Sequence, residues 1–284
     1  MKARFHNILV PVDFTINTDL ALAKAFEMSQ GELKALHLFH VQRMAVPGFL
    51  KLLQRYIAGY SRRQMNEDRQ LLMERLEQVR DRVKATHGDI PIYISASFGD
   101  PVEEAIVRKA SRLKTDLIII GKKSHHSIFP FRNTVVPSRV ASQTGQPVFT
   151  VKPGSLDQEI KTVVLPIAGR SPQRKLEALE ALRKKYKVQV RLVTFEEDEK
   201  NISQARQSLF EAIRRLRSFQ TIPVDYEVLQ GNNKARVLLR YCQKVGADVL
   251  IVHPELETRI SIWGNRHISD MLPANSKTSV LAVG

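Results

Sequence analysis

Short apolar runs recur along the chain and alternate with longer segments in which apolar and polar residues mix. The five runs of the first half have the length and composition of buried strands. One of them, residues 116–120 (DLIII), is apolar at almost every position, which is typical of a central strand in a parallel sheet. We predict strands over residues 6–12, 34–41, 90–97, 116–120 and 147–152.

The segments between these strands have the periodicity of helices. Residues 17–29 begin at a capping candidate, Asn17 or Thr18, and residues 135–142 are predicted to form a short helix. The long charged segment 49–85 carries one apolar helical face, which comprises Leu71, Leu72, Leu76, Val79 and Val83.

The helix that follows the third strand has the clearest predicted start. Asp100 is the expected cap, Pro101 suits the first helical position, and Glu103 completes a capping box. This helix runs to about Leu113. Strands that alternate with helices predict the α/β class, with a parallel sheet covered by helices on both faces.

The same pattern occurs a second time. Residues 163–167 (VVLPI) resemble residues 8–12 (ILVPV), and Asp248 follows Asp116 by 132 positions, as Gly231 follows Gly99. The first strands are offset by 155 positions, which is 23 more than the later segments. The second copy is therefore 23 residues shorter, and the difference falls between its first and third strands. Residues 152–159 (KPGSLDQE) read as a linker, and we predict two domains, residues 1–154 and 155–284.

The pattern also predicts where a ligand would bind. Open parallel sheets bind ligands at the carboxyl ends of their strands, where the strand order reverses. With the first strand central, that point lies between Asp13 and Gly121, and Asn133 and Thr134 precede a helix whose free N–H groups suit phosphate. An Asp13 carboxylate there either accepts hydrogen bonds from a ribose or a base, or caps nearby loop amides. Gly121 lets backbone amides approach an anion.

The order and spacing of four segments resemble the universal stress protein family: ILVPVDFT (8–15), LFHV (38–41), DLIIIG (116–121) and PVFTVKP (147–153). The resemblance covers nearly all of residues 1–152 and, more weakly, residues 161–284. It implies two flavodoxin-like domains, of the adenine-nucleotide alpha hydrolase-like type, each with a five-stranded parallel sheet and helices on both faces. It also implies pairing through the fifth strands, within this tandem chain as a pseudo-dimer or between chains in a homodimer.

Some members of this family bind ATP through the motif Gly-x2-Gly-x9-Gly-Ser/Thr. In the first copy Gly121 takes the first glycine position, Ser124 the second, and Thr134 and Val135 the final pair. The resemblance therefore implies weak or no binding of ATP or AMP in the first domain. The residues that would contact the nucleotide are Pro11, Val12, Asp13, Thr15, Val41, Gly121, Lys122, Lys123, Ser124, Asn133, Thr134 and Val135.

The second copy departs further from this motif, because Ala168 stands in place of Asp13, and His253 and Leu256 occupy the first two glycine positions. We expect no nucleotide there. In the first copy, Lys122 and Lys123 with their histidine neighbours either replace lost amide contacts to phosphate or form an exposed basic loop. Adjacent histidines without Cys or carboxylate partners at ligand spacing give no metal prediction.

Composition narrows the function classes. The formal net charge of +15 is spread over both copies, with 23 basic against 14 acidic residues up to position 155 and 21 against 15 after it. Such diffuse charge favours solvated basic helices over a nucleic-acid partner. Cys242 is the single cysteine. The apolar run that stops at Asp13 is too short for a signal peptide, and no apolar run approaches the ~20 residues of a membrane helix. We expect a cytoplasmic protein.

Two functional hypotheses remain from the sequence. No Gly-x-Ser-x-Gly, Walker, His-Glu-x-x-His or Gly-x-Gly-x-x-Gly motif is present, and we do not expect an enzyme. The first hypothesis is a stress-response protein that binds an adenine nucleotide in the first copy. The alternative is a tandem scaffold that binds no nucleotide and acts through contacts with an unknown protein partner.

Overall fold

The computed structural model describes residues 5–29, 32–42, 58–122, 135–156, 158–167, 172–195, 199–217, 223–258 and 267–284. Strands and helices alternate in both halves, as predicted. The first half contains β1 (Asn7–Val12), α1 (Ile16–Ser29), β2 (Ala35–Gln42), α2 (Ala58–His87), β3 (Ile92–Phe98), α3 (Val102–Leu113), β4 (Leu117–Gly121), α4 (Pro137–Thr144) and β5 (Val148–Val151). After a short 3-10 turn, η3 (Pro153–Ser155), the second contains β6 (Thr162–Pro166), α5 (Gln173–Arg183), β7 (Gln189–Phe195), α6 (Glu199–Arg217), β8 (Val224–Leu229), α7 (Lys234–Val245), β9 (Val249–Val252), α8 (Ile268–Met271) and β10 (Ser279–Ala282).

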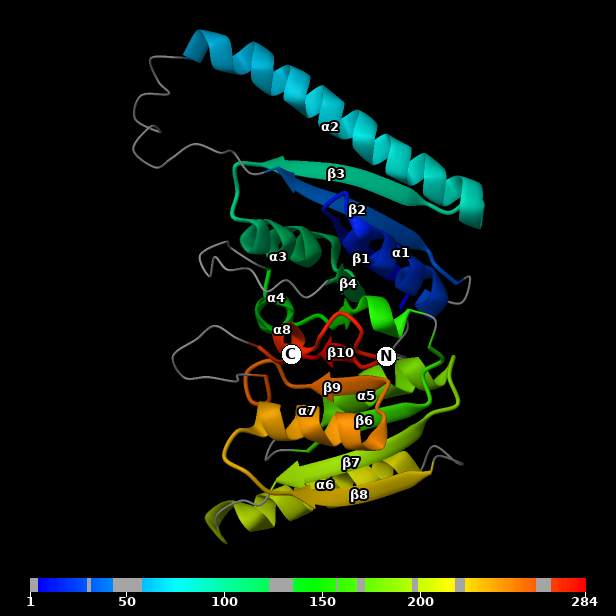
Figure 1. Ribbon diagram of the computed structural model, residues 1–284, viewed down its shortest axis with the longest axis vertical. Coiled ribbons are helices and arrows are strands. Elements are labelled where there is room, and N and C mark those ends of the chain that lie inside the picture. Colours follow the sequence, from blue (N-terminus) through cyan, green and yellow to red (C-terminus); the bar gives the residue numbers. More distant parts are fainter. Residues whose placement is uncertain are drawn as a thin grey trace.

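The strands of both halves join in one ten-stranded sheet that runs the length of the molecule (Figure 1), in the order β3-β2-β1-β4-β5-β10-β9-β6-β7-β8. Each half is parallel within itself. The strand order reverses at β1 in the first half and at β6 in the second. This is the predicted flavodoxin-like topology, present twice.

The halves meet where β5 and β10 pair in antiparallel register. Phe149 faces Leu281, flanked by the pairs of Thr150 with Val280 and Val148 with Ala282. Positions 149 and 281 are separated by the repeat spacing of 132, so this central pair of equivalent residues lies at the middle of the seam between β5 and β10. The prediction of intrachain pairing through the fifth strands is confirmed.

One tertiary contact is repeated in both halves. The carboxylate of Asp116 accepts hydrogen bonds from two backbone N–H groups at the start of β1, at 2.9 and 3.1 Å. The carboxylate of Asp248 accepts two from the start of β6, both at 2.8 Å. The duplicated aspartates therefore anchor the first strand of each half to the fourth.

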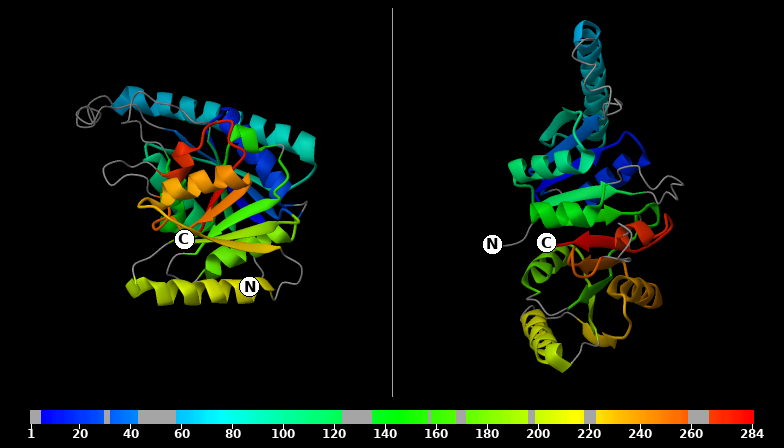
Figure 2. Two further views of the ribbon diagram at one scale, coloured as in Figure 1. Left: turned by 60° about the horizontal axis from the view of Figure 1, so that its bottom comes forward. Right: turned by 90° about the vertical axis from the view of Figure 1, so that its left-hand side faces the viewer.

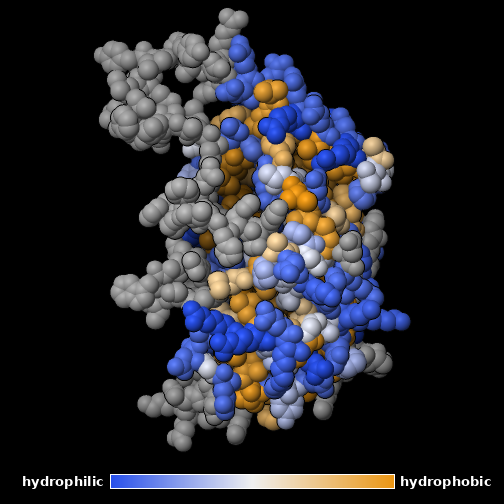
Figure 3. Space-filling model, in the orientation of Figure 1, coloured by the Kyte–Doolittle hydropathy of each residue, from blue (hydrophilic) through white to orange (hydrophobic). Residues whose placement is uncertain are grey.

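Helices cover both faces of the sheet (Figure 2). Apolar residues of α1, α2, α5 and α6 form one core that extends under both halves, and those of α3, α4, α7 and α8 form a second core on the opposite face. Cys242 lies buried in this second core, and burial raises the pKa of its thiol to about 12. On the face shown in Figure 3, the outward surface of α2 and α7 is mostly hydrophilic.

The predicted cap of α3 is wrong. The helix begins at Val102, and Pro101 in the cap position has no side-chain capping hydrogen bond. The Asp100 carboxylate instead accepts a hydrogen bond from Ser97 and forms an ion pair of 2.7 Å with Arg108. Pro101 is in an extended conformation, so the helix starts one residue later than predicted, and the Asp100 carboxylate bonds to these two side chains instead of the helix N–H groups.

Two further local predictions are corrected. Helix α1 begins at Ile16, and its start is capped by Thr15, whose Oγ1 accepts a hydrogen bond of 3.2 Å from the backbone N–H of Asn17. Thr18 lies inside the first turn. On α2, Leu71 is 59% exposed, whereas the other four residues of the predicted apolar face are buried.

Replacement of Phe149 by alanine tests the importance of the seam. The ring is fully buried, so we expect Phe149→Ala to lower the free energy of unfolding by about 3–5 kcal/mol in chemical denaturation. Phe210→Ala is the matched control, because that ring is 70% exposed, and we expect a change below about 0.5 kcal/mol. Equal effects of the two substitutions would contradict the interpretation that the seam forms a packed part of the core.

Candidate functional site

Asp13 follows β1 directly and organises the turn that leads into α1. Its Oδ1 accepts hydrogen bonds from the backbone N–H of Thr15 at 3.0 Å and from the hydroxyls of Thr15 and Thr18 at 2.7 and 2.9 Å. Its Oδ2 accepts one from the Asn17 side-chain amide at 2.9 Å. The carboxylate therefore caps its own loop, as the second interpretation held. Because the residue is exposed and Oδ2 has one partner among the described residues, Oδ2 still has room for another donor.

The charge of Asp13 is stabilised by this loop. Partial burial would raise the pKa of Asp13, but the hydrogen bonds donated by Asn17, Thr15 and Thr18 outweigh it and hold the pKa below its ordinary value. The carboxylate is therefore ionised at neutral pH. An ionised acceptor of this kind suits an amino group or a hydroxyl, not a phosphate.

Gly121 ends β4 beside the start of α1. A Cβ at this position would lie 1.9 Å from the backbone carbonyl oxygen of Asn17, so a side chain cannot fit without a backbone shift. Since Asn17 also donates to Asp13, the structure brings the ends of β1 and β4 together at one edge of the sheet. The glycine is required by this close packing of β4 against α1.

Lys122 points away from that turn and toward the second half. Its Nζ donates to the carbonyl oxygen of Val135 at 3.2 Å and forms an ion pair with Asp270 of α8. Asp270 also accepts a hydrogen bond from the backbone N–H of His267 at 3.1 Å. Lys122 and Val135 thus help to join the halves, a role that only the duplicated sheet reveals.

The remaining predicted residues divide into two groups. At the end of β1, the carbonyl oxygen of Val12 accepts a hydrogen bond of 2.7 Å from Nδ1 of His40, Pro11 is paired with β2, and Val41 is buried near the end of β2. These residues lie on strands that neighbour Asp13. Lys123, Ser124, Asn133 and Thr134 lie outside the described residues, as does Ala168 of the second copy.

A fully buried lysine lies at the same seam. Lys152 directly follows β5, and no described residue accepts a hydrogen bond from its Nζ. Burial and, to a smaller extent, the positive charge of Lys122 lower the pKa of Lys152 to about 8, while Asp270 acts in the opposite direction. The sequence placed Lys152 at the start of a linker and gave no signal that it would be enclosed.

The corresponding edge of the second half is filled by the chain itself. The carboxylate of Glu257 accepts two hydrogen bonds from Nζ of Lys175, at 2.6 and 2.7 Å, and one from the backbone N–H of His253 at 2.7 Å. Lys175 also donates to the carbonyl oxygen of Pro166 at 2.8 Å, and both charged side chains are buried. His253 is the counterpart of Gly121, so a carboxylate of the chain occupies the place where an anion would meet this loop.

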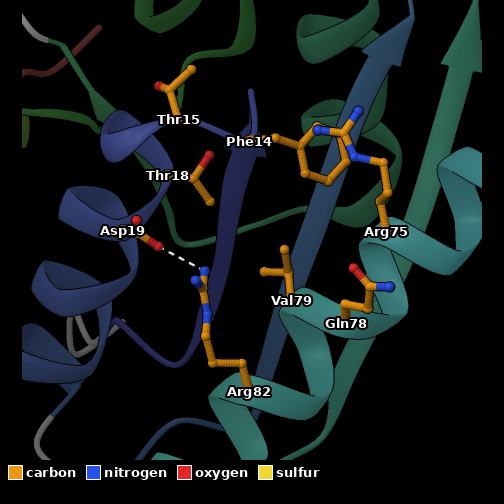
Figure 4. A pocket seen from close by; sticks show the side chains of 8 residues that line it. All are labelled: Phe14, Thr15, Thr18, Asp19, Arg75, Gln78, Val79 and Arg82. Carbon is orange, nitrogen blue, oxygen red and sulfur yellow. Dashed lines mark hydrogen bonds and ion pairs between the residues drawn. The ribbon is translucent and has the colours of Figure 1, made fainter.

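A hollow of about 280 Å³ lies between the β1–α1 turn and α2 (Figure 4). Sequence reasoning found only Thr15 among its residues. The missed residues include Arg75, Gln78 and Arg82, whose spacing of three, four and seven positions places them on one side of a helix. That spacing was the available signal. The lining consists of Phe14, Thr15, Thr18, Asp19, Arg75, Gln78, Val79 and Arg82.

Two other site types find no support in the described ranges. Among those residues, no three His, Cys, Asp or Glu side chains gather as a metal site would require. None of the helices in these ranges has both the length and the apolar character of a membrane span.

The duplicated sheet, joined edge to edge, defines a tandem flavodoxin-like α/β protein. The model of the Universal stress protein family matches residues 4–152, which is more than half of the chain. The chain belongs to the universal stress protein family, a family of stress-response proteins. No curated protein matches the chain.

Solved structures share this fold. A universal stress protein from Archaeoglobus fulgidus DSM 4304 has a TM-score of 0.64 at 16% identity, with 98% of each chain covered. A functionally unknown protein from Pseudomonas aeruginosa PAO1 has a TM-score of 0.54 at 16% identity, over 98% of this chain and 92% of that one.

The stability cost of Lys152 is testable through its pH dependence. Between pH 8 and its ordinary pKa of 10.5, the unfolded chain binds more protons at this residue than the folded chain does. The destabilisation caused by burying Lys152 is therefore full below pH 8 and decreases as pH rises. We expect Lys152→Met to raise the free energy of unfolding by about 3 kcal/mol at pH 7 and by much less at pH 10.5, measured with urea. The exposed Lys161→Met is the control, and a pH-independent gain at Lys152 would argue against this explanation.

The buried pair in the second half gives a separate test. We expect Glu257→Leu to cost about 3–5 kcal/mol of unfolding free energy, because it leaves the Lys175 ammonium buried without its charge partner. The double variant Lys175→Met, Glu257→Leu should recover at least half of that loss. Additive losses in this cycle would show that the pair is not coupled.

Proposed function

We propose that this chain is a cytoplasmic stress-response protein that binds an adenine nucleotide, ATP or AMP, at the carboxyl edge of the first half. The second half serves as its structural partner. The observation that carries the proposal is the exposed, ionised Asp13 carboxylate at the point where the strand order reverses, in the half whose edge is not filled by a Glu257–Lys175 pair.

Each predicted residue has a role in this proposal. Asp13 accepts a hydrogen bond from the amino group of the base or from a ribose hydroxyl, the groups that suit an ionised acceptor. The end of β1 and Val41 border the base, and Thr15 keeps the carboxylate in place. The phosphate side is assigned to Gly121 at the end of β4 and to Lys123, Ser124, Asn133 and Thr134, which follow it in the sequence, while Lys122 and Val135 join the halves. No bond-breaking step is assigned to any of them.

Two observations favour the alternative, a tandem scaffold without nucleotide that acts through protein contacts. The hydrogen bonds to Asp13 come from its own loop, and Lys122 forms an ion pair across the seam. Both residues thus have structural roles that do not depend on a ligand. This hypothesis differs from the first in one measurable respect, which is saturable nucleotide binding.

The test is calorimetric titration of the purified full chain with ATP and AMP. We expect Asp13→Asn to weaken nucleotide binding about tenfold or more, because it removes the charge from a charge-assisted hydrogen bond. Asp116→Asn is the matched control, since that carboxylate accepts backbone hydrogen bonds at the opposite end of β1, and its affinity should equal that of the wild type.

Two outcomes would contradict the nucleotide proposal as stated, and the first of them would favour the scaffold. The first is no saturable heat from the wild type with millimolar ATP or AMP. The second is equal affinity of the wild type and Asp13→Asn. Gly121 is a poor position for this test, because a side chain there collides with Asn17 and disturbs the fold whether or not a nucleotide binds.

A further inference from the structure

The hollow between α1 and α2 has a chemistry of its own. It is lined by side chains of the β1–α1 turn, α1 and α2, and by none of the residues after β4 that the nucleotide proposal uses for phosphate. Arg75, Gln78 and Arg82 line it from α2, and hydroxyl groups of Thr15 and Thr18 line it from the opposite side (Figure 4). Both hydroxyls already donate their single proton to Oδ1 of Asp13, so the donors left for a ligand come from α2.

Phe14 sets the position of the first guanidinium. Its backbone φ of 55° lies in the left-handed region, which is rare for an aromatic residue. The turn held by Asp13 presents the Phe14 ring toward α2, and the guanidinium of Arg75 lies over that ring, 4.1 Å from its centroid. Stacking fixes the plane of the guanidinium and leaves its N–H edges available.

Donors in the hollow exceed acceptors. Arg82 forms an ion pair of 2.7 Å with Asp19, and both side chains are more than half exposed. Arg75 makes no hydrogen bond to a described residue, and neither does the side-chain amide of Gln78. Two guanidinium groups against one carboxylate leave an excess of one positive charge. The hollow thus favours an anionic occupant that accepts hydrogen bonds from several directions.

We propose that this hollow binds the phosphate group of a small phosphate ester. A tetrahedral oxyanion can accept from the two guanidinium groups and the Gln78 amide of α2 at the same time, whereas a planar carboxylate suits a single fork. The volume of about 280 Å³ lies at the lower end of the range for small-molecule sites, which limits the ligand to a small molecule. This site does not depend on nucleotide binding at the edge of the sheet.

The experiment is a titration of the full-length protein with inorganic phosphate, and then with glycerol 3-phosphate, at constant low ionic strength. Binding is followed by the NMR signals of the Gln78 side-chain amide and by calorimetry. We expect saturable shifts of the Gln78 amide, an affinity about tenfold lower in Arg75→Gln, and a smaller loss in Gln78→Ala. Acetate at the same ionic strength should bind more weakly than phosphate.

Arg69→Gln is the matched control. Arg69 belongs to the same helix and lies over the ring of Phe98, outside the hollow, so the same loss of charge should leave phosphate affinity within about twofold of the wild type. Three results would overturn the proposal: no saturation with phosphate, equal weakening by Arg69→Gln and Arg75→Gln, or acetate binding as tightly as phosphate. ATP affinity should be unchanged in Arg75→Gln, so this proposal and the nucleotide proposal fail separately.

Discussion

The antiparallel pairing of β5 with β10 is the contact on which the rest of the structure depends. An exposed edge strand carries unpaired backbone groups that invite association, and here each half covers the inner edge of the other. The pairing brings α4 and α8 together, and contacts such as the Lys122–Asp270 ion pair and the hydrogen bond of 2.8 Å between Ser138 and His267 follow from it. The buried Lys152 lies at the same seam, where Lys122 of the first half and Asp270 of the second both affect its pKa.

Duplication has left two carboxyl edges of the sheet that differ in one physical respect. A buried anion site needs a negative charge to match its donors, and the second half supplies that charge from Glu257. The pair with Lys175 is satisfied within the chain, so a nucleotide would have to displace it. The first half has Asp13 in an exposed turn at this edge, which leaves this half the better candidate for binding.

The turn after β1 connects two separate surfaces. The carboxylate of Asp13 faces the edge of the sheet, and its hydrogen bond with the backbone of Thr15 helps hold the conformation in which Phe14 stacks with Arg75. Phe14 also lies near His40, with ring centroids 4.8 Å apart, and His40 in turn donates to the end of β1. One short turn therefore organises both the candidate nucleotide edge and the hollow beside α2.

Much of the fold was determined by the sequence. Alternating apolar runs and amphipathic segments gave the strands and helices within a few residues, and constant offsets between copies gave the duplication, because both depend on local periodicity. Caps were less predictable. Asp100 pairs with Arg108 instead of capping α3, and Thr15 took the place expected for Asn17 or Thr18, since several side-chain oxygens near a helix start can accept from its free N–H groups.

Only the tertiary structure decided what several of the candidate site residues do. Gly121 suggested room for an anion, but its missing side chain makes room for the backbone of Asn17. Lys122 suggested a phosphate ligand, but its charge meets Asp270, which lies 148 positions away in the sequence. Hydrophobic periodicity depends on neighbouring residues and can be recognised from the local sequence. The partner of a charged group, or the segment that packs against a glycine, depends on which distant segments the folded sheet brings together.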